Sequence, residues 1–336
     1  MPTLSKDTWE EFMKRLLRWL FAAPFVAGLC QPAPAQDFPK RPVTIVVPFA
    51  AGGGGDILAR MAVQRLEPKW GVPVVVENKP GAGGNIGAAA VARAAPDGHT
   101  LLLAGSPQFA VNVTLFKTLP YDPVKDFVPL ALAAATPFVL VVNPSVPAHD
   151  VREFITYAKA QPQPLSYATA GFGVPHHLYM ELLKSMTGIN MTPVPYRGSA
   201  PALSDVVAGH VPVMFVDLGP GLGQMQAGGV RVLGGSMARR LDALPDAQPV
   251  NETLPGFDVA SWQMYAAPAG TPRNIVVKLN ADLREIMDLP DMKEQVRKSG
   301  MLPLEAGSVD QLQAFMKSEI ARWSDVVRKA GIEGSQ

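Results

Sequence analysis

The chain has 336 residues, of which 48% are hydrophobic and 18% charged, and its formal net charge at pH 7 is +1. A net charge this small, with no run of basic residues, argues against nucleic acid as a partner. The single cysteine excludes an internal disulfide framework, so an apolar core must supply the stability.

The first 35 residues carry the features of a secretory signal peptide. A positive region precedes an apolar run of 11 residues at 19–29, too short to span a bilayer, and Ala33-Pro34-Ala35 follows. This pattern predicts cleavage before Gln36 and a mature protein in the periplasm. The alternatives are a retained membrane anchor and a lipid anchor on Cys30, which the bulky Leu29 disfavours.

Cleavage would change the composition of the chain. Four of the 30 basic and three of the 29 acidic residues lie in the leader, so 26 of each remain, and Cys30 is lost. No other apolar stretch is long enough to span a membrane, so we expect a soluble mature protein.

The first part of the mature chain alternates short apolar strands with amphipathic helices, which is typical of an α/β protein with parallel sheets. The β-branched run from Val43 to Val47 is typical of a strand buried on both faces. Strands are predicted at 43–47, 72–76 and 100–104, and helices at 57–69 and 86–94.

A glycine-rich turn follows each of the first two strands, at 48–56 and at 78–85. Glycine adopts φ > 0 readily and lets backbone N–H groups approach a ligand. Asp56 is expected to cap the helix that begins at Ile57, and free N–H groups at a helix start attract an anion. The two turns predict a carboxylate site; the alternative is two tight turns without a ligand.

These turns match neither of two common nucleotide-binding motifs that are rich in glycine. A phosphate-binding P-loop ends in Gly-Lys-Ser/Thr, which neither turn contains. A dinucleotide fingerprint starting at Gly52 or Gly53 needs a third glycine where Ile57 or Leu58 stands.

The rest of the chain predicts a second unit inserted into the first. Extended runs at 138–143 and 261–267 are candidate hinges, which favours two lobes with a cleft between them. A single continuous domain is the alternative. Strands are predicted near 166–168, 192–195, 213–216 and 230–233, and helices near 151–160, 177–187, 200–208, 222–227, 272–287, 291–299 and 309–330.

Spaced motifs along the chain together resemble one family. They are Phe38-Pro39-Lys40-Arg41-Pro42, the turns at 48–53 and 77–87, Ala95-Pro96-Asp97-Gly98-His99-Thr100-Leu101, and segments at 119–127, 194–198, 266–272 and 329–332. From about Phe38 to Ile332 the chain resembles the periplasmic solute-binding receptors of tripartite tricarboxylate transporters, the Bug-type receptors. The resemblance implies an α/β, type II periplasmic-binding-protein fold. Lobe 1 would comprise 36–137 and 261–336, and lobe 2 would comprise 138–260.

The resemblance also implies which residues hold the ligand. In such receptors the two glycine turns of the first lobe grip one carboxylate, partly through water. The corresponding residues here are Phe49, Ala50, Ala51, Gly52, Gly53, Asn78, Gly81, Gly83, Gly84 and Asn85. In the second lobe they are Thr169, Ala170, Gly171 and Asp217, although Asp217 is equally compatible with capping the helix from Leu218.

The second-lobe loop departs from the family pattern. Val174 and Pro175 stand where many members have a small polar residue, and with Phe172 they make the pocket edge more apolar. This favours a carboxylate with an apolar or aromatic body over citrate. The adjacent His176 and His177 would point about 100° apart on a helix and are poor joint metal ligands, so we expect His177 to be structural.

The resulting hypothesis is a monomeric periplasmic receptor that captures a small organic carboxylate and delivers it to integral membrane transporter subunits. A ligand-loaded sensor partner of a membrane signalling protein is the alternative. A hydrolase is not expected, because the chain has no Gly-x-Ser-x-Gly motif and no cysteine after cleavage. No cofactor or metal site is predicted.

Overall fold

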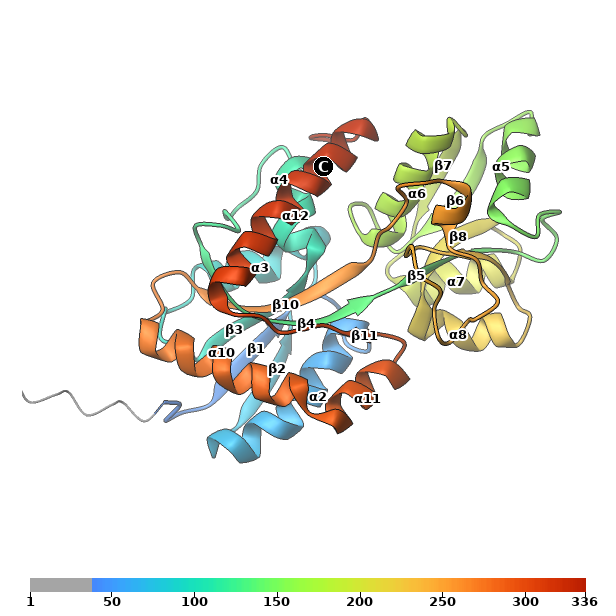
Figure 1. Ribbon diagram of the computed structural model, residues 1–336. Helices are drawn as coiled ribbons and strands as arrows, with labels where there is room; N and C mark the ends of the chain where they lie inside the picture. The colour runs from blue at the N-terminus through green and yellow to red at the C-terminus, as the bar shows by residue number, and fades with distance from the viewer. Residues whose placement is uncertain (1–37) are drawn as a thin grey trace, which may run out of the picture. The chain divides into compact units, whose positions relative to one another are not determined.

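Two mixed β-sheets organise the computed structural model, which describes residues 38–336 (Figure 1). The predicted signal peptide, 1–35, lies outside the described residues. The first sheet has the strand order β11-β4-β10-β3-β1-β2 and the second β7-β6-β8-β5-β9. The strands are β1 Val43–Val47, β2 Val74–Asn78, β3 Thr100–Gly105, β4 Phe127–Thr136, β5 Phe138–Val142, β6 Leu165–Thr169, β7 Met191–Pro195, β8 Val213–Asp217, β9 Arg231–Gly235, β10 Ser261–Pro268 and β11 Leu302–Pro303.

Helices connect the strands of each sheet. The first sheet has these helices: α2 Gly54–Trp70, η1 Ala82–Gly84, α3 Asn85–Ala92, η2 Pro107–Val111, α4 Asn112–Leu115, α10 Arg273–Asp288, α11 Pro290–Lys298 and α12 Val309–Lys329. Those of the second sheet are α5 Val151–Ala160, α6 Pro175–Thr187, α7 Ser199–Val207, α8 Leu218–Gln226 and α9 Val250–Thr253. Among residues 38–336 no helix has the length and apolar character needed to cross a membrane.

Two predicted elements are confirmed to the residue, and one helix start is corrected. β1 and α5 have the predicted bounds, and β10 extends one residue beyond the run predicted at 261–267. The side chain of Asp150 caps α5 by accepting a hydrogen bond from the Glu153 N–H. The helix predicted from Ile57 begins earlier, at Gly54, with Gly53 as its N-cap. Asp56 therefore lies in the first turn of α2 and does not cap it.

The expectation of parallel sheets was wrong in part, because both sheets are mixed. β1, β2 and β3 are parallel, but β10 runs antiparallel to β3 and β4, and β5 runs antiparallel to β8 and β9. β4 was not predicted at all, since its sequence contains Pro129 and four alanines, which have low strand propensity. Pairing with β10 overrides that propensity, and Pro129 lies opposite Ala266 at a shift in register.

The runs predicted as hinges are paired strands inside the sheets. β5 lies between β8 and β9, and β10 lies between β4 and β3. Figure 1 shows β4 in green beside β10 in orange, as their pairing requires. The chain therefore passes between the sheets at Pro137 and again just before Ser261.

Ser236 ties these two crossing segments together. Its fully buried hydroxyl donates to the carbonyl of Val259 at 2.7 Å and accepts from the N–H of Phe138 at 3.0 Å. Its backbone N–H donates to the carbonyl of Phe138, and the Val259 N–H donates back to the Ser236 carbonyl. One serine thus satisfies polar groups of both crossings.

A buried carboxylate fixes α12 against the strand β10. Glu319 accepts hydrogen bonds from the indole N–H groups of Trp262, at 2.6 Å, and Trp323, at 3.1 Å. The Trp323 ring stacks on Tyr179 of α6 with centroids 6.0 Å apart. α12 therefore contacts elements of both sheets.

We expect the substitution Ser236→Ala to lower the free energy of unfolding by about 1–3 kcal/mol, because it leaves buried Phe138 and Val259 backbone groups unpaired. Urea denaturation measures the change. The exposed bond from Ser318 to the Phe315 carbonyl provides the control, and Ser318→Ala should change the value by less than about 0.5 kcal/mol. Equal effects of the two substitutions would contradict the role assigned to Ser236.

Candidate functional site: paired glycine turns at the strand ends

The two predicted glycine turns begin at neighbouring strand ends. β1 and β2 are parallel partners, and their register places Val47 opposite Asn78. The Asn78 side chain donates from Nδ2 to the carbonyl of Phe49 at 3.0 Å, and the Lys79 N–H donates to the Val47 carbonyl at 2.9 Å. These bonds hold the first turn directly beside the second.

The first turn is braced by Asp56. Its buried carboxylate accepts a hydrogen bond from the Gly52 N–H at 2.9 Å and pairs with Arg60 at 3.0 Å. Burial alone would raise the pKa of Asp56, but hydrogen bonds from Arg60, Gly52 and Asn78 hold it below its ordinary value. Gly52 has φ 83°, as a glycine here was expected to, whereas Gly53 has an extended φ of −76°. The Gly52 N–H is used internally, so the start of α2 is left to bind an anion.

The second turn has an unusual backbone. Gly81, Ala82, Gly83 and Gly84 all have positive φ, and Ala82 is the one non-glycine residue with positive φ among residues 38–336. A β-carbon on Gly84 would overlap the side-chain amide of Gln108, so only glycine fits there. Backbone strain of this kind is concentrated at functional sites.

A buried network of hydrogen-bonded side chains holds the second turn on its interior side. Asn85 Oδ1 lies 2.6 Å from Asn112 Nδ2 and 3.0 Å from the Tyr121 hydroxyl, and Gln108 donates to the Gly83 carbonyl at 2.6 Å. Burial raises the pKa of Tyr121, so its hydroxyl stays protonated. The Asn85 side chain, expected at the ligand, is thus committed to the protein interior, and only its backbone at the start of α3 is left for a ligand.

The predicted second-sheet residues lie at the ends of β6 and β8. Thr169 is fully buried and its hydroxyl donates to the Gly171 carbonyl at 2.7 Å, so its side chain closes its own loop. Ala170 and Gly171 are half-buried and follow directly. These loop backbone groups, rather than the Thr169 hydroxyl, are the candidate ligand contacts.

Asp217 belongs to a partly buried cluster with His176, which the sequence analysis considered only as a metal ligand, and Ser199, which it did not single out. One carboxylate oxygen lies 2.9 Å from Nε2 of His176, which also lies 3.2 Å from the Ser199 hydroxyl. Asp217 is the N-cap residue of α8, but its side chain makes no cap bond, so the expected side-chain capping is wrong. Burial alone would raise the Asp217 pKa, but His176 and Ser199 hold it below its ordinary value.

This cluster does not have the arrangement of a hydrolytic triad. A triad needs one ring nitrogen of histidine toward the serine and the other toward the carboxylate. Here the same nitrogen of His176 faces both Ser199 and Asp217, and Nδ1 has no hydrogen-bond partner among the described residues. The cluster is suited to binding a polar group.

Two more polar groups near the start of α2 were missed from the sequence. Thr136 Oγ1 and Gln263 Oε1 are buried without a hydrogen-bond partner in the described part of the chain. A β-carbon on Gly54 would lie 3.6 Å from Gln263 Nε2 and 3.9 Å from Thr136 Oγ1. The only sequence signal was a glutamine within the otherwise apolar β10.

Phe116 lies close to both sets of predicted residues. A β-carbon on Gly83 of the second turn would lie 3.3 Å from this ring, and one on Gly173 of the β6–α6 loop would lie 3.9 Å from it. The same Gly173 position is 2.5 Å from Leu115. The glycine turn of the first sheet and the loop of the second therefore approach the same aromatic side chain.

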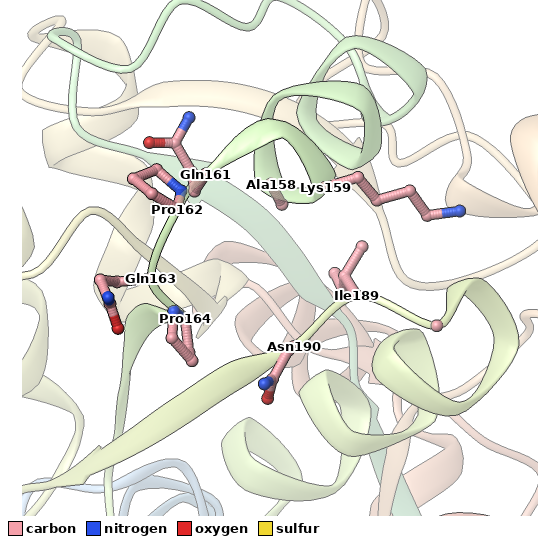
Figure 2. Close-up of a pocket in the computed structure, with 9 residues that line it drawn as sticks. Ala158, Lys159, Gln161, Pro162, Gln163, Pro164, Ile189 and Asn190 are labelled. Carbon is pink, nitrogen blue, oxygen red and sulfur yellow. The ribbon is translucent and has the colours of Figure 1, made fainter.

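A surface cavity of about 240 Å³ lies elsewhere, at the C-terminal ends of α5 and α6 (Figure 2). Its lining includes Lys159, Gln161, Gln163 and Asn190 and none of the predicted site residues. Carbonyl groups at helix C-termini disfavour an anion, so this cavity is not the predicted carboxylate site.

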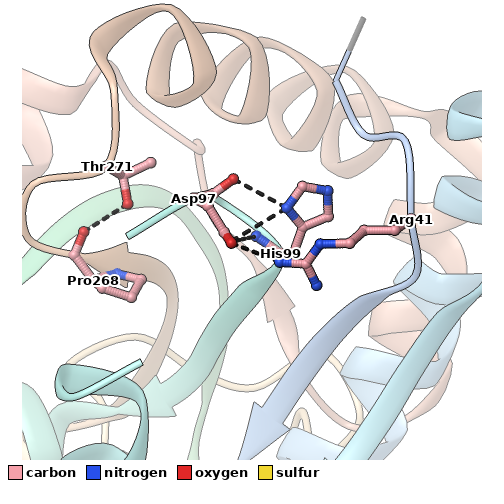
Figure 3. Close-up of polar contacts among 5 residues, drawn as sticks. All are labelled: Arg41, Asp97, His99, Pro268 and Thr271. Atoms are coloured by element: carbon pink, nitrogen blue, oxygen red, sulfur yellow. Dashed lines mark hydrogen bonds and ion pairs between the residues drawn. The ribbon is translucent and has the colours of Figure 1, made fainter. Parts of the chain in front are cut away.

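Two further sequence motifs have a structural role at the other end of β3 (Figure 3). Asp97 pairs with Arg41 at 2.6 Å and accepts a hydrogen bond from the His99 N–H at 3.0 Å, just before β3 begins. Thr271 donates to the Pro268 carbonyl at 2.7 Å, just after β10 ends. These contacts shape turns at the edge opposite the glycine turns.

His177 is buried, and we therefore expect the free energy of unfolding to depend on its protonation. Burial lowers its pKa from 6.5 to about 4, with Glu181 opposing and Lys184 reinforcing the shift. The folded state thus prefers neutral His177: the stabilisation is complete above pH 6.5 and is lost as the pH falls toward 4, by up to about 3 kcal/mol.

We expect His177→Gln to reduce the loss of unfolding free energy between pH 7 and pH 4, as measured by urea denaturation at both values. The exposed His149 provides the matched control, and His149→Gln should leave that difference unchanged. A His177→Gln variant that loses as much stability as the unsubstituted protein would refute this assignment.

Comparison with known proteins identifies the family of the chain. The profile of the tripartite tricarboxylate transporter family receptor matches residues 58–332. Protein BugT of Bordetella pertussis is 35% identical over 95% of this chain and 98% of its own length. A solved structure of an R. palustris protein with adipate is 37% identical with a TM-score of 0.83; the match covers 88% of this chain and 99% of that one.

The solved structure of MatC from Rhodopseudomonas palustris with bound malate is 36% identical with a TM-score of 0.79; the match covers 86% of this chain and 100% of that one. The chain belongs to the tripartite tricarboxylate transporter receptor family of periplasmic solute-binding proteins.

Proposed function

We propose that this protein captures a small organic carboxylate in the periplasm and delivers it to integral membrane transporter subunits. The observation that carries the proposal is the bond from Asn78 to the Phe49 carbonyl, which fixes two anion-binding turns side by side. The lobes would comprise 36–137 with 261–336 and 138–260, and the carboxylate would be held between them.

Backbone groups would supply most of the recognition of the first carboxylate. The starts of α2 and α3 each offer N–H groups and the positive end of a helix dipole. Lys79, the one cationic residue of the two turns, pairs with Glu77 at 3.1 Å. Backbone amides and bridging water would therefore bind the anion without a dedicated counter-charge.

The middle of the ligand would contact apolar side chains. Leu115, Phe116 and Val174 flank the loop at Gly173, and the Phe172 ring is 40% exposed and packs edge-on against His177. The cluster of His176, Ser199 and Asp217 would take a second polar group. Of two similar proteins, one was solved with adipate and the other with malate. Because apolar side chains flank this loop, we propose a carboxylate with an apolar body, of the adipate type.

A thermal-shift panel of adipate, malate, benzoate and citrate tests this proposal. At a hundredfold excess over Kd, a ligand of the folded state stabilises it by about 2.7 kcal/mol, which raises Tm. We expect adipate or benzoate to raise Tm more than citrate at equal concentration. A response to citrate alone would refute the apolar body, and no response to any organic acid in a wider panel would refute carboxylate capture.

Substitution of Gln263 separates binding from stability. Because its Oε1 is buried and unpartnered, Gln263→Leu should leave the Tm of the empty protein equal or higher. It should weaken binding of the best acid of the panel about tenfold in calorimetry, which corresponds to the loss of one hydrogen bond. Gln161→Leu, at the cavity of Figure 2, is the control and should bind normally. Unchanged affinity in Gln263→Leu would exclude Gln263 from the ligand site.

A further inference from the structure

A groove of about 270 Å³ lies on α3 beside the second glycine turn and is unexplained by ligand capture. Its walls include Ile86, Ala89, Phe116 and Pro120, with Arg93 and Thr118 at its borders. We call it the α3 groove. It shares Ala82 and Asn85 of the second turn, and Phe116, with the proposed carboxylate site.

Large apolar side chains extend the surface around this groove. Ile86 is 56% exposed, Val113 is 39% exposed, and Phe172 is 40% exposed. Phe172 precedes Gly173, which lies against Leu115 and Phe116. Apolar side chains gathered at one place on a soluble protein indicate an interaction surface. A small molecule in the groove would leave Val113 and Phe172 exposed, so a larger partner fits better.

The charge at the groove is positive. Arg93 is the charged residue of its lining; it is exposed and forms no ion pair with another of residues 38–336. The guanidinium of Arg93 is held along α3 by its bond from Nε to the Ala89 carbonyl at 3.1 Å. An apolar groove lined by one unpaired cation is complementary to an acidic segment with an apolar anchor residue.

The groove also lies where the two sheets' loops approach each other. Phe116 forms its wall and faces both Gly83 of the second turn and Gly173 of the β6–α6 loop. Moving that loop away would remove Phe172 and Gly173 from this surface. The surface is therefore complete only when the loop lies against Phe116.

We propose that the α3 groove docks an acidic segment, with an apolar anchor, of an integral membrane transporter subunit. Docking there would distinguish a receptor whose β6–α6 loop contacts Phe116 from one whose loop has moved away. This inference rests on the proposed delivery role and adds the surface that performs it.

A photo-crosslinking residue placed at Thr118, in the full-length protein expressed in its source bacterium, tests the docking. The matched control position is Val277, which is 57% exposed on α10. We expect Thr118 to give a product that mass spectrometry assigns to an acidic, apolar segment of an integral membrane protein, with little product from Val277. Products at Thr118 with lipid, with a soluble protein or with a second copy, or yields equal to Val277, would overturn the proposal.

Reversing the charge of Arg93 in the same experiment tests whether this residue attracts the acidic segment. Arg93→Glu should lower the Thr118 yield about tenfold, whereas Arg284→Glu, at another exposed arginine of the first sheet's helices, should leave it unchanged. Equal yields in the two variants would overturn the role of Arg93. Both variants should keep the wild-type thermal shift with the panel acids.

The two proposals fail in different ways. If no acid raises Tm but Thr118 still crosslinks to a membrane subunit, carboxylate capture fails and docking stands. If the thermal shift is normal but the crosslink is absent, docking at the α3 groove fails and capture stands.

Discussion

The candidate site depends on one hydrogen bond, from the Asn78 side-chain amide, that joins its two glycine turns. Asn78 closes β2 and bonds to the carbonyl of Phe49 beyond the end of β1, so two glycine turns are held at one edge of a parallel pair. Helix starts at this edge supply donors for an anion without a charged side chain. The proposed recognition of the first carboxylate follows from this pairing.

Some buried polar groups stabilise the fold, whereas two near the start of α2 are candidates for ligand contact. Ser236, Glu319 and Asn85 each satisfy several partners and fix the crossings, α12 and the second turn. Thr136 and Gln263 instead have polar atoms with no partner among the described residues, beside the start of α2. Since an unsatisfied buried group is unfavourable, such groups are expected where a ligand completes them.

Much of this could be predicted from the sequence, because local patterns were strong. The β-branched run of β1 and the helix α5 were found with their bounds, and β10 was found to within one residue. β4 was missed, because an alanine-rich segment with Pro129 becomes a strand only through its pairing with β10. The mixed direction of the sheets depends equally on long-range pairing.

The glycine turns could be identified from the sequence, but the hydrogen bonds within them could not. Sequence alone showed neither that Asp56 would take the Gly52 N–H nor that the Asn85 side chain would face inward. His176, Ser199 and Asp217 come from α6, α7 and the end of β8, so only the fold brings them together.

Backbone amide NMR during titration with the best acid of the panel tests the central claim most directly. The account predicts that the largest shifts occur at the amides of 53–57 and 81–86, where the two turns start α2 and α3. Shifts confined to other places, such as the residues lining the cavity between α5 and α6, with both turns unchanged, would contradict it.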